Sequence, residues 1–193
     1  METPESKHAV FQILNRQKDG ATSAGTGWFS QDAQELAAEM FGPEFASKNV
    51  YAITNNHVVN GAEALFSRHS VARKLDLPLT VVSVCPQVDL ALVKLESTAK
   101  DYLLQHLGAK AGLKKVPSLR LGDSDSLRPE HIDPSKTLLS IGYPLGSEFK
   151  TFTAGAPNGF KRLEDGLCYV QHQASIQPGN SGGVAMMNGL VLT

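Results

Sequence analysis

Short apolar runs separated by turn-forming residues are the feature that most constrains the fold of this chain. The runs lie at residues 10–14, 50–53, 79–84, 90–95, 138–141, 167–171 and 189–192. Clusters of Gly, Pro, Asn and Asp lie between them, and these residue types favour turns. A series of short strands joined by such turns predicts an all-β barrel or sandwich.

Two stretches instead show the spacing of apolar residues that is typical of a helix. Residues 32–41 form the first, and Asp32 with Glu35 has the spacing of a capping box at its start. The Gly-Pro pair that follows is expected to end this helix. A second helix is expected at residues 99–107, closed by Gly108. Both are expected to pack against the β-structure.

Length and composition fit a single globular domain and exclude several classes of function. The chain has 193 residues, a hydrophobic content of 41% and a net charge of −1. Such a charge gives no long-range attraction to nucleic acid or to anionic membranes. No apolar stretch approaches the roughly 20 residues of a transmembrane helix. Cys and His do not occur at metal-ligand spacings, so we expect neither a metal nor another cofactor. Cys85 and Cys168 are too few for a disulfide scaffold and are expected to be free, buried thiols.

The start of the sequence bears on the compartment. Residues 1–8 are polar and contain no apolar signal region. If Met1 is the native start, the protein is expected in the cytoplasm. If a targeting segment was removed, it is expected in the periplasm or in an organelle.

The segment Gly-Asn-Ser-Gly-Gly at residues 179–183 is the strongest candidate for chemistry. A serine flanked by glycines has little side chain to pack. It suits a tight loop that exposes one hydroxyl and directs backbone N–H groups at a common point. Ser181 is therefore a candidate nucleophile, with N–H groups nearby to stabilise an oxyanion. A plain glycine-serine turn is the alternative.

A base and an orienting acid complete this hypothesis. His57 follows a strand-like run and is expected in the loop just past the strand end, where catalytic groups are common. Asp89 lies between two hydrophobic runs and is expected to be a buried carboxylate that orients the imidazole. A turn residue between two strands is the alternative for Asp89. Asp76 and Asp123 are competitors for the same role, and both are expected to be more solvated.

Six segments of the chain carry a family pattern. They are Gly-Thr-Gly-Trp-Phe at 25–29, Thr-Asn-Asn-His-Val-Val at 54–59, Val-Asp-Leu-Ala-Leu-Val at 88–93, Leu-Gly-Asp-Ser-Asp-Ser-Leu at 121–127, Ile-Gly-Tyr-Pro-Leu-Gly at 141–146 and Pro-Gly-Asn-Ser-Gly-Gly at 178–183. These words, with the candidates in the order His, Asp, Ser, resemble the HtrA (Deg) family of trypsin-like serine proteases. The resemblance covers nearly the whole chain, from Ala9 to Thr193.

The resemblance implies two six-stranded β-barrels with a few short helices and a catalytic cleft between the barrels. It divides one protease domain, residues 1–193, into a first barrel at about 9–96, a connection at 97–135 and a second barrel at 136–193, with no PDZ domain. The family normally continues for several strands beyond the position of Thr193, so the second barrel is expected to be truncated.

The resemblance also implies a function, which is hydrolysis of peptide bonds by a serine endopeptidase in HtrA-like protein quality control. Ser181 would form an acyl-enzyme, His57 would transfer the proton and Asp89 would orient His57. The backbone N–H groups of Gly179 and Ser181 would form the oxyanion hole. The implied partners are protein or peptide substrates, including unfolded ones, and further copies of the chain in a homo-oligomer such as a trimer. A catalytically weak binding or chaperone module is the alternative.

Two residues bear on the substrate pocket. Ser175 falls where trypsin-like enzymes have the floor of the primary specificity pocket. Because it is not a carboxylate, uncharged substrate side chains are expected rather than Lys or Arg. His172 lies near Ser181 in the sequence and either lines the cleft or faces outward from a strand. The outward position is expected.

Overall fold

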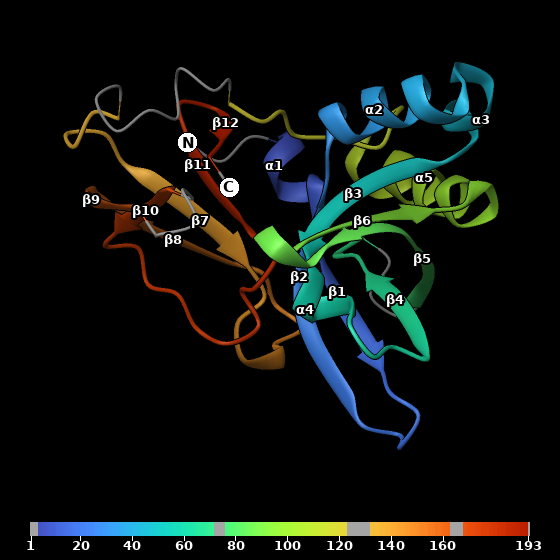
Figure 1. Cartoon of the computed structure of the whole chain (residues 1–193). Helices are drawn as coiled ribbons and strands as arrows, with labels where there is room; N and C mark the ends of the chain where they lie inside the picture. Colours follow the sequence, from blue (N-terminus) through green and yellow to red (C-terminus); the bar gives the residue numbers. More distant parts are fainter. Residues whose placement is uncertain (1–3, 72–75, 123–131, 163–167, 193) are drawn as a thin grey trace.

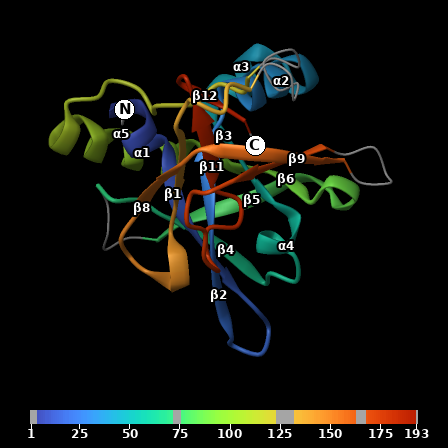
Figure 2. The same ribbon diagram turned by 90° about the vertical axis from the view of Figure 1, so that its left-hand side faces the viewer.

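The computed structural model describes residues 4–71, 76–122, 132–162 and 168–192 (Figure 1). Its regular structure is mainly β, in two bodies that lie side by side, one from each half of the sequence. Figure 2, a quarter-turn away, shows the second body in front of the first. The prediction of an all-β fold class is confirmed. Within the described residues, no helix has the length and apolar character needed to cross a membrane.

The first body is a closed barrel of six antiparallel strands in the order β1-β2-β3-β6-β5-β4. Its strands are β1 (Val10–Arg16), β2 (Thr22–Phe29), β3 (Val50–Asn55), β4 (Ala64–Arg68), β5 (Asp76–Cys85) and β6 (Leu90–Leu95). Apolar side chains from these strands fill the interior, among them Phe11, Ile13, Ala52, Val93 and Leu95, each 0% exposed. Since alternate residues of a strand point to opposite faces, each strand contributes one to three residues to this core. The six-stranded first barrel agrees with the prediction, although the sequence pattern does not predict β2 or β4.

The second body consists of two smaller sheets. One has the order β12-β11-β7-β8 and the other pairs β10 with β9. Their strands are β7 (Leu138–Gly142), β8 (Thr151–Gly155), β9 (Pro157–Arg162), β10 (Cys168–His172), β11 (Val184–Met187) and β12 (Leu190–Val191). Single hydrogen bonds connect the two sheets, from Gln173 N–H to the Ala156 carbonyl at 3.0 Å and from the Thr153 hydroxyl to the Ser175 carbonyl at 2.8 Å. Because these bonds do not extend into a ladder, the expected second six-stranded barrel is only partly present in the described residues.

Helices lie at the edges of the β-structure. They are α1 (Pro4–Ala9), α2 (Gln31–Phe41), α3 (Pro43–Lys48), α4 (Asn56–Val59) and α5 (Ser97–Ala111), with short 3₁₀ turns η1 (Pro86–Val88) and η3 (Pro144–Gly146). Helix α5 is longer than the helix expected at 99–107, because Gly112, not Gly108, ends it in a left-handed conformation with φ of 67°.

The start of α2 corrects the predicted capping box. The N-cap is Ser30, whose hydroxyl accepts a hydrogen bond from the Ala33 N–H at 3.1 Å. Asp32 and Glu35 instead face Arg120, with N–O distances of 3.7 and 2.6 Å. A cation distant in the sequence therefore binds the two carboxylates that the local pattern assigns to the helix end.

One buried cluster joins the two bodies. Trp28 of β2 is 1% exposed and packs with residues of the second body, among them Ile141 and Val191. The segment that follows α5 also spans the junction, since the Leu119 N–H donates to the Phe29 carbonyl at 2.9 Å and the Gly122 N–H donates to the Val191 carbonyl at 2.8 Å. This cluster and strap fix how the two bodies sit relative to each other.

Cys85 differs from expectation. It lies at the end of β5, and its thiol is free and exposed rather than buried. The cause is the position at the rim of the barrel, where the strand leaves the core.

His69 is a buried histidine of the first barrel and is 3% exposed. Its ring stacks on Phe29, with 5.6 Å between centroids, and a hydrogen bond of 2.9 Å joins Nε2 to the Ser67 hydroxyl. Burial, together with the nearby positive charge of Lys150, lowers the pKa of His69 from its ordinary value of 6.5 to about 3. The folded protein therefore holds this imidazole neutral.

This pKa makes the stability of the protein depend on pH. The folded pKa lies below the unfolded one, so the unfolded chain binds the extra proton between them. The His69 contribution is fully present above about pH 6.5 and is lost as the pH falls toward 3, by about 1.4 kcal/mol per pH unit. His69→Phe keeps an aromatic ring but cannot titrate. Urea unfolding from about pH 7 to pH 4 measures the free energy of unfolding of both proteins. We expect this free energy to fall with pH in the parent and to fall less in the variant. Equal pH slopes for the two proteins would contradict the assignment.

Candidate active site

His57 is held by a short helix rather than by an open loop. It lies on α4, which begins directly after β3 and also contains Val58, a residue that the sequence pattern assigns to a strand. Val58 packs closely on β2, because a Cβ atom at Gly25 would lie 2.6 Å from its Cγ1 atom. A glycine at this position lets α4 approach the barrel, and the approach directs the His57 side chain outward, where it is exposed.

Asp89 binds His57 through two hydrogen bonds. Its Oδ2 atom lies 2.6 Å from Nδ1 of the ring, and its Oδ1 atom accepts the His57 backbone N–H at 2.9 Å. The Asp89 backbone is left-handed, with φ of 53°, and its carbonyl accepts the Asn55 side chain at 2.8 Å and the Asn56 N–H at 3.0 Å. A carboxylate at Nδ1 favours the tautomer with a proton on that nitrogen. Nε2 is then the nitrogen that can accept a proton.

The burial of the two competing acids is the reverse of what the sequence predicts. The Asp89 side chain is 45% exposed and that of Asp76 only 20%. Asp76 makes a two-pronged ion pair with Arg68, with N–O distances of 2.8 and 3.1 Å, and so has a partner other than His57. Asp123, the other competitor, lies outside the described residues. The interaction with His57 therefore belongs to Asp89, in a half-exposed pair at the barrel rim.

The loop around Ser181 contains two glycines in the left-handed region of backbone conformation. Gly179 and Gly182 have φ values of +96° and +79°. The Asn180 N–H donates to the Gln177 carbonyl at 3.0 Å. In the part of the chain that the structure describes, the N–H groups of Gly179 and Ser181 donate no hydrogen bond. These two unengaged donors, on either side of Asn180, can bind the oxygen of a negatively charged group.

Thr26 of β2 attaches this loop to the first barrel. Its N–H donates to the Ser181 carbonyl at 2.8 Å, and its hydroxyl donates to the Gly179 carbonyl at 2.8 Å. The same hydroxyl accepts the Tyr143 N–H at 3.0 Å. The Thr26 carbonyl accepts the hydroxyl of Thr54, on the strand that leads to His57, at 2.7 Å. One buried residue thus connects the serine loop to the strand of the histidine.

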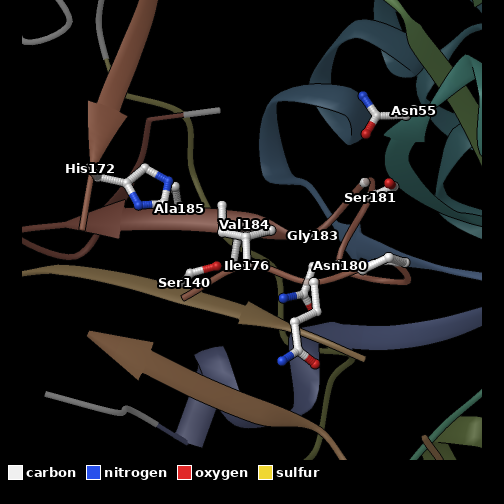
Figure 3. A pocket seen from close by; sticks show the side chains of 12 residues that line it. Asn55, Ser140, His172, Ile176, Asn180, Ser181, Gly183, Val184 and Ala185 are labelled. Carbon is white, nitrogen blue, oxygen red and sulfur yellow. The ribbon is translucent and has the colours of Figure 1, made fainter. Parts of the chain in front are cut away.

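A pocket of ≈ 500 Å³ opens beside Ser181 (Figure 3). Its lining residues are Asn55, Ser140, His172, Ile176, Gln177, Pro178, Asn180, Ser181, Gly182, Gly183, Val184 and Ala185. Ser181 lies at the end nearest Asn55, and His172 lies at the opposite end. The expected outward position of His172 is therefore not observed. The sequence gives no signal for its position, because the pocket is assembled from segments that are distant along the chain.

The other predicted residues lie around this pocket rather than in it. Ser175 is exposed and is not among the lining residues, so its role in a substrate pocket stays a prediction. His57 is also not among them. No hydrogen bond links the His57 ring to the Ser181 hydroxyl among the described residues. Catalytic hydrogen bonds of this kind are often long without substrate. Among the same residues, no cluster of His, Cys, Asp and Glu could hold a metal ion.

Residues 25–188 match the family model of the trypsin-like peptidase domain. A probable periplasmic serine endoprotease DegP-like of Marinomonas sp. (strain MWYL1) is 34% identical over 140 residues, which are 71% of this chain and 25% of that protein. Its counterpart of Pseudomonas fulva (strain 12-X) is 32% identical over 162 residues, 82% of this chain and 28% of that protein.

Solved structures give the same result. The HtrA-type protease AlgW with tripeptide has a TM-score of 0.67 at 25% identity, over 96% of this chain and 49% of that chain. The serine endoprotease from Yersinia pestis, at 22% identity and a TM-score of 0.65, shares the fold over 98% of this chain and 57% of that one. The chain spans about a quarter of the length of the DegP-like relatives and about half of these solved chains.

The junction at Gly182 gives a test of how the loop is fixed. A Cβ atom there would lie 2.2 Å from both the Thr26 carbonyl oxygen and the Thr54 hydroxyl, whereas Gly61, also left-handed at φ of +71°, has no atom within 4 Å. Gly61→Ala is expected to cost roughly 1–2 kcal/mol from backbone strain alone. Gly182→Ala adds a steric clash and is expected to cost at least about 3 kcal/mol. Urea unfolding of both variants measures the difference, and equal losses would show that the loop does not press on the barrel.

Proposed function

Because this chain belongs to the trypsin-like peptidase domain family, we propose that it is a serine endopeptidase of the HtrA type. The observation that carries the proposal is the 2.6 Å hydrogen bond between His57 and Asp89 on the first barrel. Thr26 attaches the Ser181 loop to the same barrel. A histidine oriented by a carboxylate, and a serine in a loop with unengaged N–H groups, are the parts that acyl transfer needs.

The mechanism assigns one role to each residue. Ser181 Oγ attacks the carbonyl carbon of the scissile peptide bond while Nε2 of His57 takes the hydroxyl proton. The N–H groups of Gly179 and Ser181 bind the oxyanion of the tetrahedral intermediate. His57 then gives the proton to the leaving amine, which leaves an acyl-enzyme on Ser181. Water hydrolyses this ester with His57 again acting as the base. Throughout, Asp89 holds Nδ1 and stabilises the imidazolium.

The proposed substrates are proteins and peptides, including unfolded chains, in HtrA-like protein quality control. The DegP-like relatives are named as periplasmic proteins, which supports the periplasm among the compartments that the sequence leaves open. The oriented imidazole and the unengaged N–H groups favour catalysis over the alternative of a binding or chaperone module. The homo-oligomer, a trimer, that the resemblance implies stays a prediction.

The proposal predicts covalent labelling of one serine. A fluorophosphonate probe is expected to modify Ser181, with the label located by mass spectrometry of tryptic fragments. Ser181→Ala is expected to lose both the label and peptide hydrolysis while keeping the circular dichroism spectrum and melting temperature of the parent. Ser83 is an exposed serine on β5, and Ser83→Ala serves as the control. This variant is expected to keep both the label on Ser181 and peptide hydrolysis. Undiminished hydrolysis by Ser181→Ala would exclude the serine mechanism.

A second prediction separates the two acids. Asp89→Asn keeps the size of the side chain but favours the wrong imidazole tautomer, and in a serine protease such a change lowers kcat by about 10⁴. Asp76→Asn removes a carboxylate that pairs with Arg68 and is expected to keep kcat within about threefold of the parent. Steady-state kinetics on one peptide measures both. If Asp76→Asn is the more damaging change, Asp89 is not the orienting acid.

A further inference from the structure

The pocket beside Ser181 has a polar end that the proposed mechanism does not use. His172 ends β10 and lines this pocket, and its ring points toward the strand that carries Ala185 (Figure 3). Neither ring nitrogen has a hydrogen-bond partner among the described residues, and Nδ1 is fully buried. Unlike Nδ1, Nε2 is not fully buried, and the ring is directed toward Ala185 of the pocket lining (Figure 3). A polar atom without a partner is thus available to a ligand.

The described lining of this pocket carries no formal charge apart from the titratable His172. Ile176, Val184 and Ala185 supply apolar surface, and no Lys, Arg, Asp or Glu is among the lining residues. Ser140, on β7, is 8% exposed, and its hydroxyl has no hydrogen bond to another described residue. At the His172 end, the pocket therefore offers an imidazole nitrogen and a hydroxyl beside apolar side chains. The amides of Asn55, Gln177 and Asn180 add further uncharged polar groups to the lining.

We propose that His172 is a specificity-determining residue that selects a substrate with an amide side chain, glutamine above all, on the acyl side of the scissile bond. This inference rests on the proposed endopeptidase function. A neutral imidazole has one donor and one acceptor nitrogen, and an amide carries both a donor and an acceptor. Glutamine can therefore bond to Nε2 in either tautomer. The hydroxyl of Ser140 can take the second polar atom of the amide.

Other side chains fit this pocket less well. An apolar side chain of similar length, such as methionine, would cover Nε2 without giving it a partner, and an unsatisfied polar group is destabilising. Glutamate would bring a charge next to apolar walls without a cation to balance it. Lysine meets the same difficulty, since no carboxylate is among the lining residues that the structure describes.

A peptide series with Gln, Met, Glu or Lys on the acyl side of one scissile bond tests this inference on the 193-residue chain. We expect kcat/KM for Gln to exceed that for Met by about tenfold, the effect of one hydrogen bond gained in the transition state. His172→Leu removes the polar nitrogens and is expected to lower the Gln-to-Met ratio of kcat/KM about tenfold, because Gln loses its partner and Met no longer covers an unpaired nitrogen.

Two further variants keep the test independent of folding. His172→Gln retains a polar group near the position of Nε2 and is expected to restore most of the preference. His106→Leu replaces a histidine on α5, outside the pocket lining, and is expected to leave the ratio unchanged. Melting temperatures of all variants are measured alongside, and a His172→Leu protein that does not fold leaves His172→Gln and the peptide series to decide.

The outcomes distinguish the inference from the proposed function. Labelling of Ser181 with faster cleavage after Met than after Gln would overturn the specificity while the endopeptidase function stands. A preference for Gln that His172→Leu leaves unchanged would overturn the role of His172. A preference for Glu would show that the pocket accepts a charge, and would also overturn the inference. Absence of both labelling and cleavage would overturn the function and the inference together.

Discussion

The hydrogen bonds of Thr26 are the constraint on which the rest of the site depends. Strand β2 contributes one residue whose N–H and hydroxyl bind the carbonyl groups on either side of Asn180, at 2.8 Å each. Because the carbonyl groups of that loop are engaged, its N–H groups are directed elsewhere. The carbonyl of the same threonine binds Thr54 and so fixes the strand that leads to His57. Removal of this residue would therefore affect the loop and the histidine together.

Burial around Trp28 gives these hydrogen bonds a rigid base. The indole is 1% exposed and belongs to a core shared by both bodies, which excludes water from their junction. Farther along the same junction, the Gln12 side chain of β1 donates to the Ser147 carbonyl at 3.0 Å. Arg68 of β4 reaches Glu148 at 3.5 Å. The segment after β7 is thereby held against the first barrel, on the side where His69 is buried.

The parts of this structure that local patterns encode could be predicted from the sequence, and the parts that need distant partners could not. The short apolar runs of β1 and β6 and the glycines around Ser181 can each be recognised within a few residues of sequence. Strand β2 does not, because Gly25 interrupts its apolar pattern in order to admit Val58. The predicted capping box is wrong because the carboxylate of Glu35 binds Arg120, which lies 85 residues away in the sequence. The position of His172 follows from pocket walls contributed by β7, β10 and β11, which no local pattern connects.

The imidazole and the serine belong to different bodies, so their alignment is a property of the junction and not of either sheet. A partial opening at Trp28 would separate them while the hydrogen-bond ladders of both bodies stay intact. Openings of this kind require less free energy than complete unfolding. In the proposed mechanism, the reactivity of Ser181 therefore depends on the closed junction rather than on the folded state as a whole. On heating, it should disappear while circular dichroism still shows a folded β-protein.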